Sequence, residues 1–334
     1  MKKIWAAFLV VAACFLLTGC GKVSKETVVK KIDKKITNCD GYQVEANLEL
    51  INNDDSYKYD VVVSYKKKDN YRVLLMNKTN NHEQIILKNK NGVYVLSPSL
   101  NKSFKFQSNW PYDNSQGYLL QSVISDLKSD KNLKMKKQKD GYVLTSKVNY
   151  KNNPSLTHQE VIIDKDYNIK SVTVLDDNLN AQIKVVYKSI DMKAKFGKNY
   201  FSLEKNMEVS KTDDDSEVKQ TLSEAIYPMY LPQNTYLDKE NVVDLENNGS
   251  RIILTFSGDN PFMLVEQTLA KEEEMEVIPT SGDIDLFTDG LAFTSDSSVS
   301  WISDNVEYYL VSSDLSKSEL LQVARSVSSM PLSK

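Results

Sequence analysis

The hydrophobic residues of this chain recur first at helical spacing and then at every second position. Near the N-terminus, the residues spaced for one face of a helix are Val28, Val29, Ile32 and Ile36. Ser24 can cap this helix, and its pattern ends near Thr37. From Tyr42, apolar and polar residues alternate, which is typical of strands with one buried face. The pattern therefore predicts a helix followed by β-structure.

The alternation continues to Ser189 and predicts an antiparallel meander. The expected strands cover residues 42–50, 57–65, 71–77, 83–87, 93–96, 104–106, 133–137, 142–150, 158–163, 169–175 and 181–189. Asn91-Gly92 favours a tight hairpin turn between two of them. A helix predicted from Gln116 to about Leu127 interrupts the series. An alternating sheet buries one face, and the two amphipathic helices are the available covers. The fold class is therefore α+β, with either a packed core or an apolar cavity beneath the helices.

The composition changes near Tyr227-Pro228, after an acidic stretch, which predicts a second domain. An acidic linker is expected at 211–226, followed by a small α+β domain at 227–334. Its expected strands cover residues 251–257, 276–278, 291–294, 298–302 and 306–312. Asn260-Pro261 is expected to start a helix that reaches about Ala270, because proline is favoured at the first helical position. Ser316 and Glu319 form a capping box for a final helix.

The N-terminal segment resembles a bacterial lipoprotein signal. Lys2 and Lys3 precede an apolar run, and Leu17-Thr18-Gly19-Cys20 follows as a lipobox. The expected divisions are a signal peptide at 1–19, a lipidated tether at 20–23 and a first domain at 24–210. The pattern predicts a diacylglycerol thioether on Cys20 and a location on the extracytoplasmic face of the cell membrane. A secreted protein with a chance cysteine is the alternative.

The charge of the chain argues against nucleic acid as a partner, and its cysteine content limits disulfide formation. Loss of Lys2 and Lys3 changes the formal charge of the 334-residue chain from −3 to −5. A mildly acidic body does not favour nucleic acid, so membrane attachment is expected to depend on acyl chains. Cys39 alone remains after Cys14 is removed and Cys20 is lipidated. It is expected to be a small residue at a helix–strand junction, with an intermolecular contact as the alternative.

No catalytic constellation is apparent in the sequence. His82 and His158 each stand alone in a strand pattern, without neighbouring cysteine or a second histidine. The acidic runs Asp213–Asp215 and Glu272–Glu274 are better explained as a linker and a solvated helix end than as cation sites. The prediction is a protein that is not an enzyme and has no metal or cofactor.

The apolar strand positions have two interpretations. They could form an ordinary sealed core, or they could line a groove for acyl chains or a hydrophobic peptide. The candidate ligand-binding residues are Tyr59, Val61, Val63, Val73, Leu75, Val93, Val95, Phe104 and Phe106. Trp110-Pro111-Tyr112 is similarly either a packed corner or an aromatic contact for a partner or lid.

The order of these elements resembles the LolA/RseB-like superfamily. The resemblance covers roughly Val28 to Met207 and includes the hairpin from Asn91 to Pro98. It implies an open half-barrel over a hydrophobic cavity, with helices as a lid. The lipobox and the Lys- and Asn-rich meander are most similar to lipoproteins of endospore-forming Gram-positive bacteria, including the germination lipoprotein GerS family. The segment from Tyr227 resembles a small domain of unknown function attached to such lipoproteins.

Two functions follow from the residues and the resemblance. The first is binding of a lipid, acyl chain or apolar peptide in the half-barrel, in a sensing or carrier-like role. The second is a non-catalytic role as partner or regulator of an envelope protein, such as a sporulation or germination cell-wall hydrolase or a signalling protein. The sequence leaves both open.

Overall fold

The computed structural model describes residues 23–52, 55–208, 222, 224–245, 249–269, 274–287 and 290–327. The expected signal peptide, Cys20, Asp213–Asp215 and the first two residues of Glu272–Glu274 lie outside the described residues. Within the described ranges, none of the helices has the length and apolar content needed to span a bilayer.

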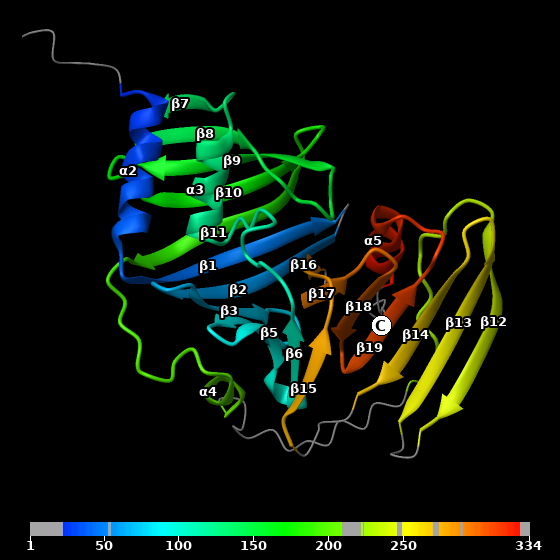
Figure 1. Ribbon diagram of the computed structural model, residues 1–334. Coiled ribbons are helices and arrows are strands. Elements are labelled where there is room, and N and C mark those ends of the chain that lie inside the picture. The colour runs from blue at the N-terminus through cyan, green and yellow to red at the C-terminus, as the bar shows by residue number, and fades with distance from the viewer. Residues whose placement is uncertain are drawn as a thin grey trace, which may run out of the picture.

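Twelve strands form the first sheet, in the order β15-β6-β5-β4-β3-β2-β1-β11-β10-β9-β8-β7. Eleven of them come from the predicted meander: β1 Gly41–Asn52, β2 Asp55–Lys66, β3 Asn70–Asn77, β4 Glu83–Asn89, β5 Gly92–Ser97, β6 Lys102–Phe106, β7 Lys134–Gln138, β8 Gly141–Lys147, β9 Leu156–Asp164, β10 Ile169–Asp176 and β11 Ala181–Asp191. The sheet is open, with β15 at one edge and β7 at the other (Figure 1). The Asn91-Gly92 turn joins β4 to β5 as the sequence predicts.

Two helices lie over the β7–β11 part of this sheet (Figure 1). Helix α2 spans Lys25–Asn38, and the Ser24 side chain caps it by accepting a hydrogen bond from the Thr27 backbone N–H at 3.2 Å. Helix α3 spans Leu120–Ser129 and begins four residues later than expected, because the extended backbone of Leu119 precedes it. Their buried faces pack with the apolar face of the sheet in one core.

The opposite face of the first sheet carries a smaller cluster. Ile85, Leu87, Tyr94 and Leu96 pack there against Phe201 and Met207. Phe201 precedes the short helix α4, Leu203–Glu208, and Met207 lies within it. A 3-10 turn at Pro98–Leu100 follows β5. The segment that follows β11 therefore covers the β4–β5 hairpin from outside.

A second sheet has seven strands in the order β12-β13-β14-β19-β18-β17-β16. Their bounds are β12 Thr235–Asp244, β13 Ser250–Gly258, β14 Phe262–Thr268, β16 Asp283–Phe287, β17 Gly290–Thr294, β18 Ser298–Ser303 and β19 Val306–Val311. Helix α5, Lys317–Arg325, packs on one face of this sheet, and both hydrogen bonds of the predicted Ser316–Glu319 capping box are present.

The helix predicted from Asn260 to Ala270 is wrong, because residues 262–268 form strand β14. Phe262 and Leu264 point into the core of the second sheet, whereas Met263 and Val265 alternate with them on the other face. Pro261 precedes the strand instead of opening a helix. Two flanking strands, β13 and β19, pair with this segment, and that tertiary pairing outweighs its helical start signal.

The strand predicted near Glu276 forms, but it does not join the second sheet. Strand β15, Glu276–Thr280, pairs in parallel with β6 at the edge of the first sheet. Figure 1 shows β15 lying beside β6. The C-terminal part of the chain therefore contributes a strand to the sheet built by the N-terminal part, and the first sheet is not purely antiparallel.

Candidate functional site

The nine predicted ligand-binding residues all lie on the apolar face of the first sheet. Each is at most 5% exposed, and all belong to the main core: Tyr59, Val61, Val63, Val73, Leu75, Val93, Val95, Phe104 and Phe106. The structure thus brings them together on one face, in the arrangement that the alternation predicts. Their burial matches the sealed-core interpretation, and ligand binding at these residues stays a prediction.

The second sheet supplies much of what covers this face. Ile284, Leu291, Phe293 and Ile302 belong to the same core as the nine residues. The ring of Phe293 lies 4.8 Å from that of Phe104 and 5.0 Å from that of Phe106, measured between centroids. Such aromatic pairs fill space that a ligand chain would otherwise occupy.

Two buried polar contacts fix the sheets to each other. The Tyr59 hydroxyl donates to the backbone carbonyl of Phe287 at 3.3 Å. The backbone N–H of Leu291 donates to the side-chain oxygen of Gln84 at 2.7 Å. Because both contacts are buried, breaking them without water would leave polar groups unsatisfied. The sheets are therefore docked by specific pairing as well as by apolar packing.

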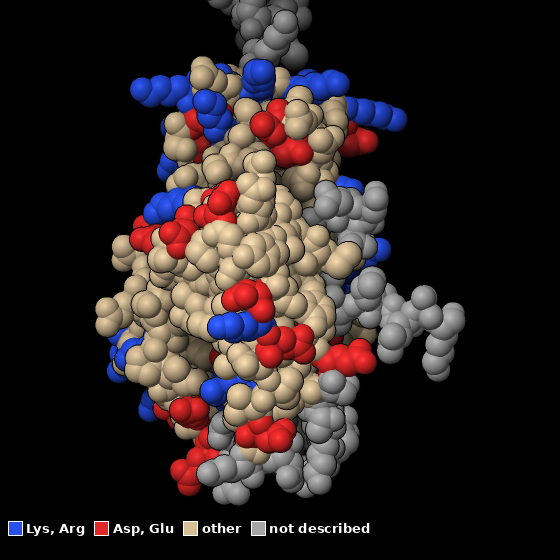
Figure 2. Space-filling model, turned by 90° about the vertical axis from the view of Figure 1, so that its right-hand side faces the viewer, with Lys and Arg blue, Asp and Glu red and all other residues tan. Residues whose placement is uncertain are grey.

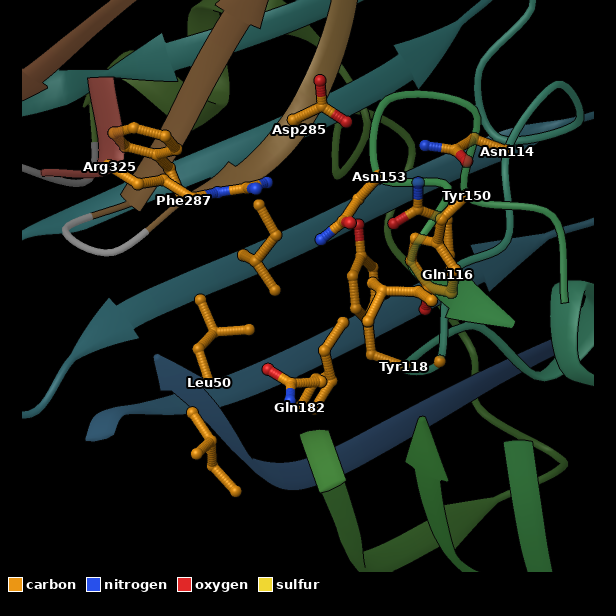
Figure 3. Close-up of a pocket in the computed structure, with 15 residues that line it drawn as sticks. Leu50, Asn114, Gln116, Tyr118, Tyr150, Asn153, Gln182, Asp285, Phe287 and Arg325 are labelled. Atoms are coloured by element: carbon orange, nitrogen blue, oxygen red, sulfur yellow. The ribbon is translucent and has the colours of Figure 1, made fainter. Parts of the chain in front are cut away.

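A cavity of about 120 Å³ remains between the sheets. Figure 3 shows Asp285, Phe287 and Arg325 on one side of it and Leu50, Tyr118 and Gln182 on the other. The remaining lining residues are Ile51, Asn114, Gln116, Gly117, Tyr150, Asn153, Leu156, Ile183 and Leu286. The volume is well below the ~300–1,000 Å³ of pockets for drug-sized ligands. The mixed lining suits a few waters or a small polar group better than an acyl chain.

Asp285 and Arg325 are the charged groups of this cavity. Burial raises the pKa of the Asp285 carboxyl, whereas hydrogen bonds from Thr294 Oγ1 at 2.6 Å and Asn152 Nδ2 at 2.6 Å act against the increase. Burial lowers the pKa of Arg325, and the nearby Asp285 opposes that change. The Arg325 guanidinium also lies 5.9 Å from the centre of the Phe287 ring. This group connects α5 and β16 with Asn152, which lies between β8 and β9.

A second hollow of about 400 Å³ lies between α2 and α3. Its lining consists of Asp33, Ile36, Thr37, Gln121, Ile124, Ser125, Lys128 and Ser129. Most of these side chains are polar, and Ile36 and Ile124 are both nearly buried in the core beneath. None of the nine predicted ligand-binding residues lines either hollow.

The face of the second sheet that contacts the first continues into solvent. Phe293, Ser300, Tyr309, Val265 and Ile253 are opposite one another on successive strands, so they form a single row on this face. Phe293 is buried in the interface, whereas Tyr309 is 44% exposed. We call the exposed end of this face the outer patch, and it consists of Ile253, Met263, Val265, Tyr309 and Val311.

Strand β12 extends this exposed surface to an open edge. Among the described strands it pairs only with β13, and nine of its ten residues are exposed, including Tyr236, Val242 and Val243. Figure 2 views the molecule from this side, where uncharged residues cover most of the visible surface. Open strand edges and exposed apolar side chains are features of protein interaction surfaces.

The two histidines lie next to different strands of the first sheet or on them. His82 is largely buried, and burial lowers its pKa. His158 lies on β9, where its Nδ1 is 2.9 Å from the Thr157 hydroxyl. Among the described residues, no three His, Cys, Asp or Glu side chains are arranged to hold a metal ion.

The remaining predicted positions are divided between core and surface. Cys39 is buried at the junction of α2 and β1, where its thiol donates to the Ile36 carbonyl at 3.0 Å. Trp110 is a packed corner, with its ring 5.7 Å from that of Tyr71. Tyr112 is 62% exposed, and its hydroxyl donates to Asp69.

Sequence reasoning missed the Asp285–Arg325 group and the outer patch. Asp285 alternates with Ile284 and Leu286, so its pattern is that of a solvent-facing strand residue. Because a helix was expected from Asn260, the alternation of Met263 and Val265 with buried residues was not recognised. That alternation was the sequence signal that could have revealed the outer patch.

Several solved structures resemble this chain only distantly. The structure of MucB in complex with MucA(peri) is 11% identical to this chain and has a TM-score of 0.33. The match covers 91% of this chain and 98% of the other chain. The LolA superfamily protein NE2245 from Nitrosomonas europaea is 12% identical, with 55% and 100% coverage and a TM-score of 0.32. In the Clostridioides difficile complex of the CwlD amidase with the GerS lipoprotein, the matched chain is 20% identical, with 53% and 98% coverage and a TM-score of 0.23. TM-scores this low carry no functional conclusion.

The sequence comparisons are much stronger. A family model described as sporulation protein YdcC-like matches residues 1–201. The sporulation protein YdcC of Bacillus subtilis (strain 168) is 33% identical over 333 residues, which cover 98% of this chain and 98% of that protein. These matches confirm the expected relationship to proteins of spore-forming bacteria. The chain belongs to the YdcC-like family of sporulation proteins.

Proposed function

We propose that the protein is a non-catalytic, lipid-anchored component of the envelope of sporulating cells, located on the extracytoplasmic face of the membrane. In this role it binds another envelope protein through the outer patch and the β12 edge. The lipobox ending at Cys20 supports the location, and the family supports the developmental context.

The observation that carries this proposal is the filling of the concave apolar face by the second sheet. Phe293 and its neighbours occupy the space above the predicted groove, and the remaining cavity measures about 120 Å³. An acyl chain would have to displace the second sheet to enter. A partner protein can bind the outer patch of the second sheet without any rearrangement, because Tyr309 and Met263 already reach solvent.

The charge of the chain after residue 210 indicates the chemistry of the partner. Residues 211–334 contain 8 Lys and Arg against 23 Asp and Glu. A complementary partner surface would be apolar at its centre and basic at its rim. A regulatory or structural target in the envelope, such as a cell-wall hydrolase or a signalling protein, fits the second of the two functions expected from the sequence.

The proposal is tested by affinity capture of the full-length, tagged chain from detergent-solubilised envelopes of sporulating cells. The outer-patch variants are Tyr309→Asp and Val265→Asp. The matched control is Val186→Asp, which changes a 51% exposed valine on β11 of the first sheet. We expect a stoichiometric partner, identified by mass spectrometry, that is retained by the control and lost by both patch variants. A partner retained by all variants would contradict the proposed surface.

A second measurement separates partner binding from lipid binding. The purified chain is titrated with a fluorescent fatty acid, and Val61→Asp and Val95→Asp serve as variants within the apolar face. Saturable, competable binding near one probe per chain, lost in folded forms of these variants, would support the hydrophobic-ligand function instead.

A further inference from the structure

Positive and negative charges are unevenly distributed between the N-terminal and C-terminal parts of the chain. Residues 23–210 contain 31 Lys and Arg against 22 Asp and Glu, whereas residues 211–334 contain 8 against 23. The first half is therefore basic and the second acidic. Although the two parts together carry only a mild negative charge, an approaching charged surface would interact with the two ends differently.

The excess of lysine is concentrated where the described chain begins. Two segments together contain 11 lysines and 4 acidic residues: residues 25–35 of α2, and residues 128–140, which include β7. The two segments lie together, because the Lys25 ammonium donates to the Leu133 carbonyl at 2.7 Å. We call these two segments the basic end. Figure 2 shows blue side chains gathered at this end and more red ones toward the opposite end.

Four lysines of the basic end are available for contact. Lys134, Lys136, Lys137 and Lys139 are exposed, and within the described residues β7 is an edge strand that pairs only with β8. Two of the four acidic residues are already paired with lysine, since Asp33 lies 2.9 Å from Lys128 and Asp140 lies 3.3 Å from Lys165. Little negative charge therefore offsets these four lysines.

The expected anchor lies close to the basic end. Only residues 21–23 separate Cys20 from Ser24, which caps α2. Four extended residue steps span at most about 14 Å. A lipid on Cys20 would thus hold the start of α2 at the level of the phospholipid headgroups. Figure 1 shows α2 and β7 at one end of the molecule and β12–β14 at the other.

We propose that the basic end docks on the anionic phospholipid headgroups of the membrane. The contact orients the molecule, with β7 against the lipid and the acidic second sheet directed away from it. The outer patch is then presented at a distance from the membrane. This inference extends the proposed function but does not depend on the lipid modification, because the lysines can bind headgroups without an acyl chain.

The test uses unlipidated protein that begins at Gly21. This form retains every described contact, because the described structure begins at Val23. Binding is measured by co-sedimentation with vesicles of phosphatidylglycerol and phosphatidylcholine in a 3:7 ratio, and with vesicles of phosphatidylcholine alone. We expect binding only to the anionic vesicles, weakened strongly between about 0.05 and 0.5 M salt as the Debye length shortens.

Two matched variants locate the contact. The basic-end variant replaces Lys134, Lys136, Lys137 and Lys139 with glutamine. The control replaces Lys58, Lys90, Lys195 and Lys198, four exposed lysines outside the basic end, with glutamine. The net charge of the two variants is the same. Since each lysine near an anionic surface contributes a factor of about three to five, we expect loss of four lysines to weaken binding of the basic-end variant about 80- to 600-fold. The control should stay within about threefold of the parent.

Two outcomes would overturn the inference. Equal loss in both variants would show a dependence on net charge without a docking surface, and absence of binding to anionic vesicles would exclude the contact altogether. Urea unfolding of both variants checks that the fold is intact. Because this assay includes neither lipidated protein nor a protein partner, its failure would leave the proposed partner binding to be judged separately.

Discussion

Gln84 and Leu291 are 207 positions apart in the chain, yet the side-chain oxygen of Gln84 accepts a hydrogen bond from the Leu291 backbone N–H at 2.7 Å. Gln84 is 2% exposed, and it lies on β4 of the first sheet, whereas Leu291 lies on β17 of the second. This buried amide, together with the Tyr59 hydroxyl, fixes the position of one sheet against the other. Gly290, adjacent to Leu291, makes this approach possible because it has no side chain.

Substitution of Gly290 should disrupt the junction of the two sheets. Gly290 has a φ of +144°, and an added Cβ would lie 2.2 Å from the Gln84 side-chain oxygen. We expect Gly290→Ala to lower the free energy of unfolding by about 2–4 kcal/mol, through backbone strain and loss of the buried hydrogen bond. Urea unfolding measures the effect. Gly197→Ala is the matched control, since an added Cβ there meets nothing within 4 Å, and its effect should stay within about 0.5 kcal/mol.

Removal of the Phe293 ring should create a cavity over the predicted groove. The ring is 7% exposed and packs on Phe104 and Phe106. Phe293→Ala should therefore cost about 3–5 kcal/mol of stability in urea unfolding and increase binding of an apolar dye. Tyr309→Ala, in the same row but 44% exposed, should cost less than about 1 kcal/mol. A Phe293→Ala cost as small as that of Tyr309→Ala would contradict the docked arrangement of the sheets.

Glu266 should make stability depend on pH near neutrality. Its side chain is fully buried, and the carboxyl accepts from the Ile226 N–H at 3.0 and 3.1 Å. Burial raises the pKa of Glu266 from 4.5 to about 7, so the folded state favours the protonated form. Its stabilising contribution is then complete below about pH 4.5 and is lost as the pH rises through 7.

Glu266→Gln should remove this part of the pH dependence. The glutamine amide oxygen can still accept from Ile226, but it cannot ionise. We expect the stability of the variant relative to the parent to increase by about 2 kcal/mol between pH 5 and pH 8. Urea unfolding at several pH values gives the difference. A difference that is constant across this range would show that Glu266 ionises normally in the folded protein.

The capping box of α5 should contribute measurably to stability. Ser316 accepts from the Glu319 N–H at 3.4 Å, and Glu319 accepts from the Ser316 N–H at 3.0 Å. Ser316→Ala should cost about 1 kcal/mol in thermal or urea unfolding, because the helix N-terminus loses its acceptor. Ser318→Ala, an exposed position two residues later, should be neutral or slightly stabilising. Equal effects at both positions would indicate that the cap is not formed in solution.

Lipid attachment should depend on one cysteine of the N-terminal segment. We expect Cys20→Ala to abolish incorporation of labelled palmitate and to release the protein from the membrane fraction. Cys14→Ala, within the predicted signal peptide, should remain labelled. Labelling that is unchanged in Cys20→Ala would show that the lipobox is not used.

Local sequence patterns predicted most of the strands, one hairpin turn and two helix starts. Alternation located the meander from β1 to β11 because a strand with one buried face must repeat every two residues. Asn91-Gly92 specified a hairpin, and Ser24 and Ser316 specified helix starts, because the relevant hydrogen bonds join residues close in sequence.

The errors arose where distant residues supplied the deciding contact. Residues 262–268 carry a helix-start signal at Pro261, but pairing with β13 and β19 makes them a strand. Residues 276–280 read as a strand in either sheet, and only the edge of β6 determined which sheet they joined. Such pairings depend on geometry that a local pattern does not encode.

The sequence by itself determined the types of the elements from α2 to β11, the apolar face that these strands share and the expected lipid site at Cys20. These follow from short-range periodicity, backbone preferences and a contiguous motif. Only the tertiary structure decided that Phe293 fills this face, that Asp285 is buried and that the lysines of α2 and β7 gather at one end. Those outcomes depend on packing between residues far apart in the chain, where burial is set by the partner surface and not by the neighbouring sequence.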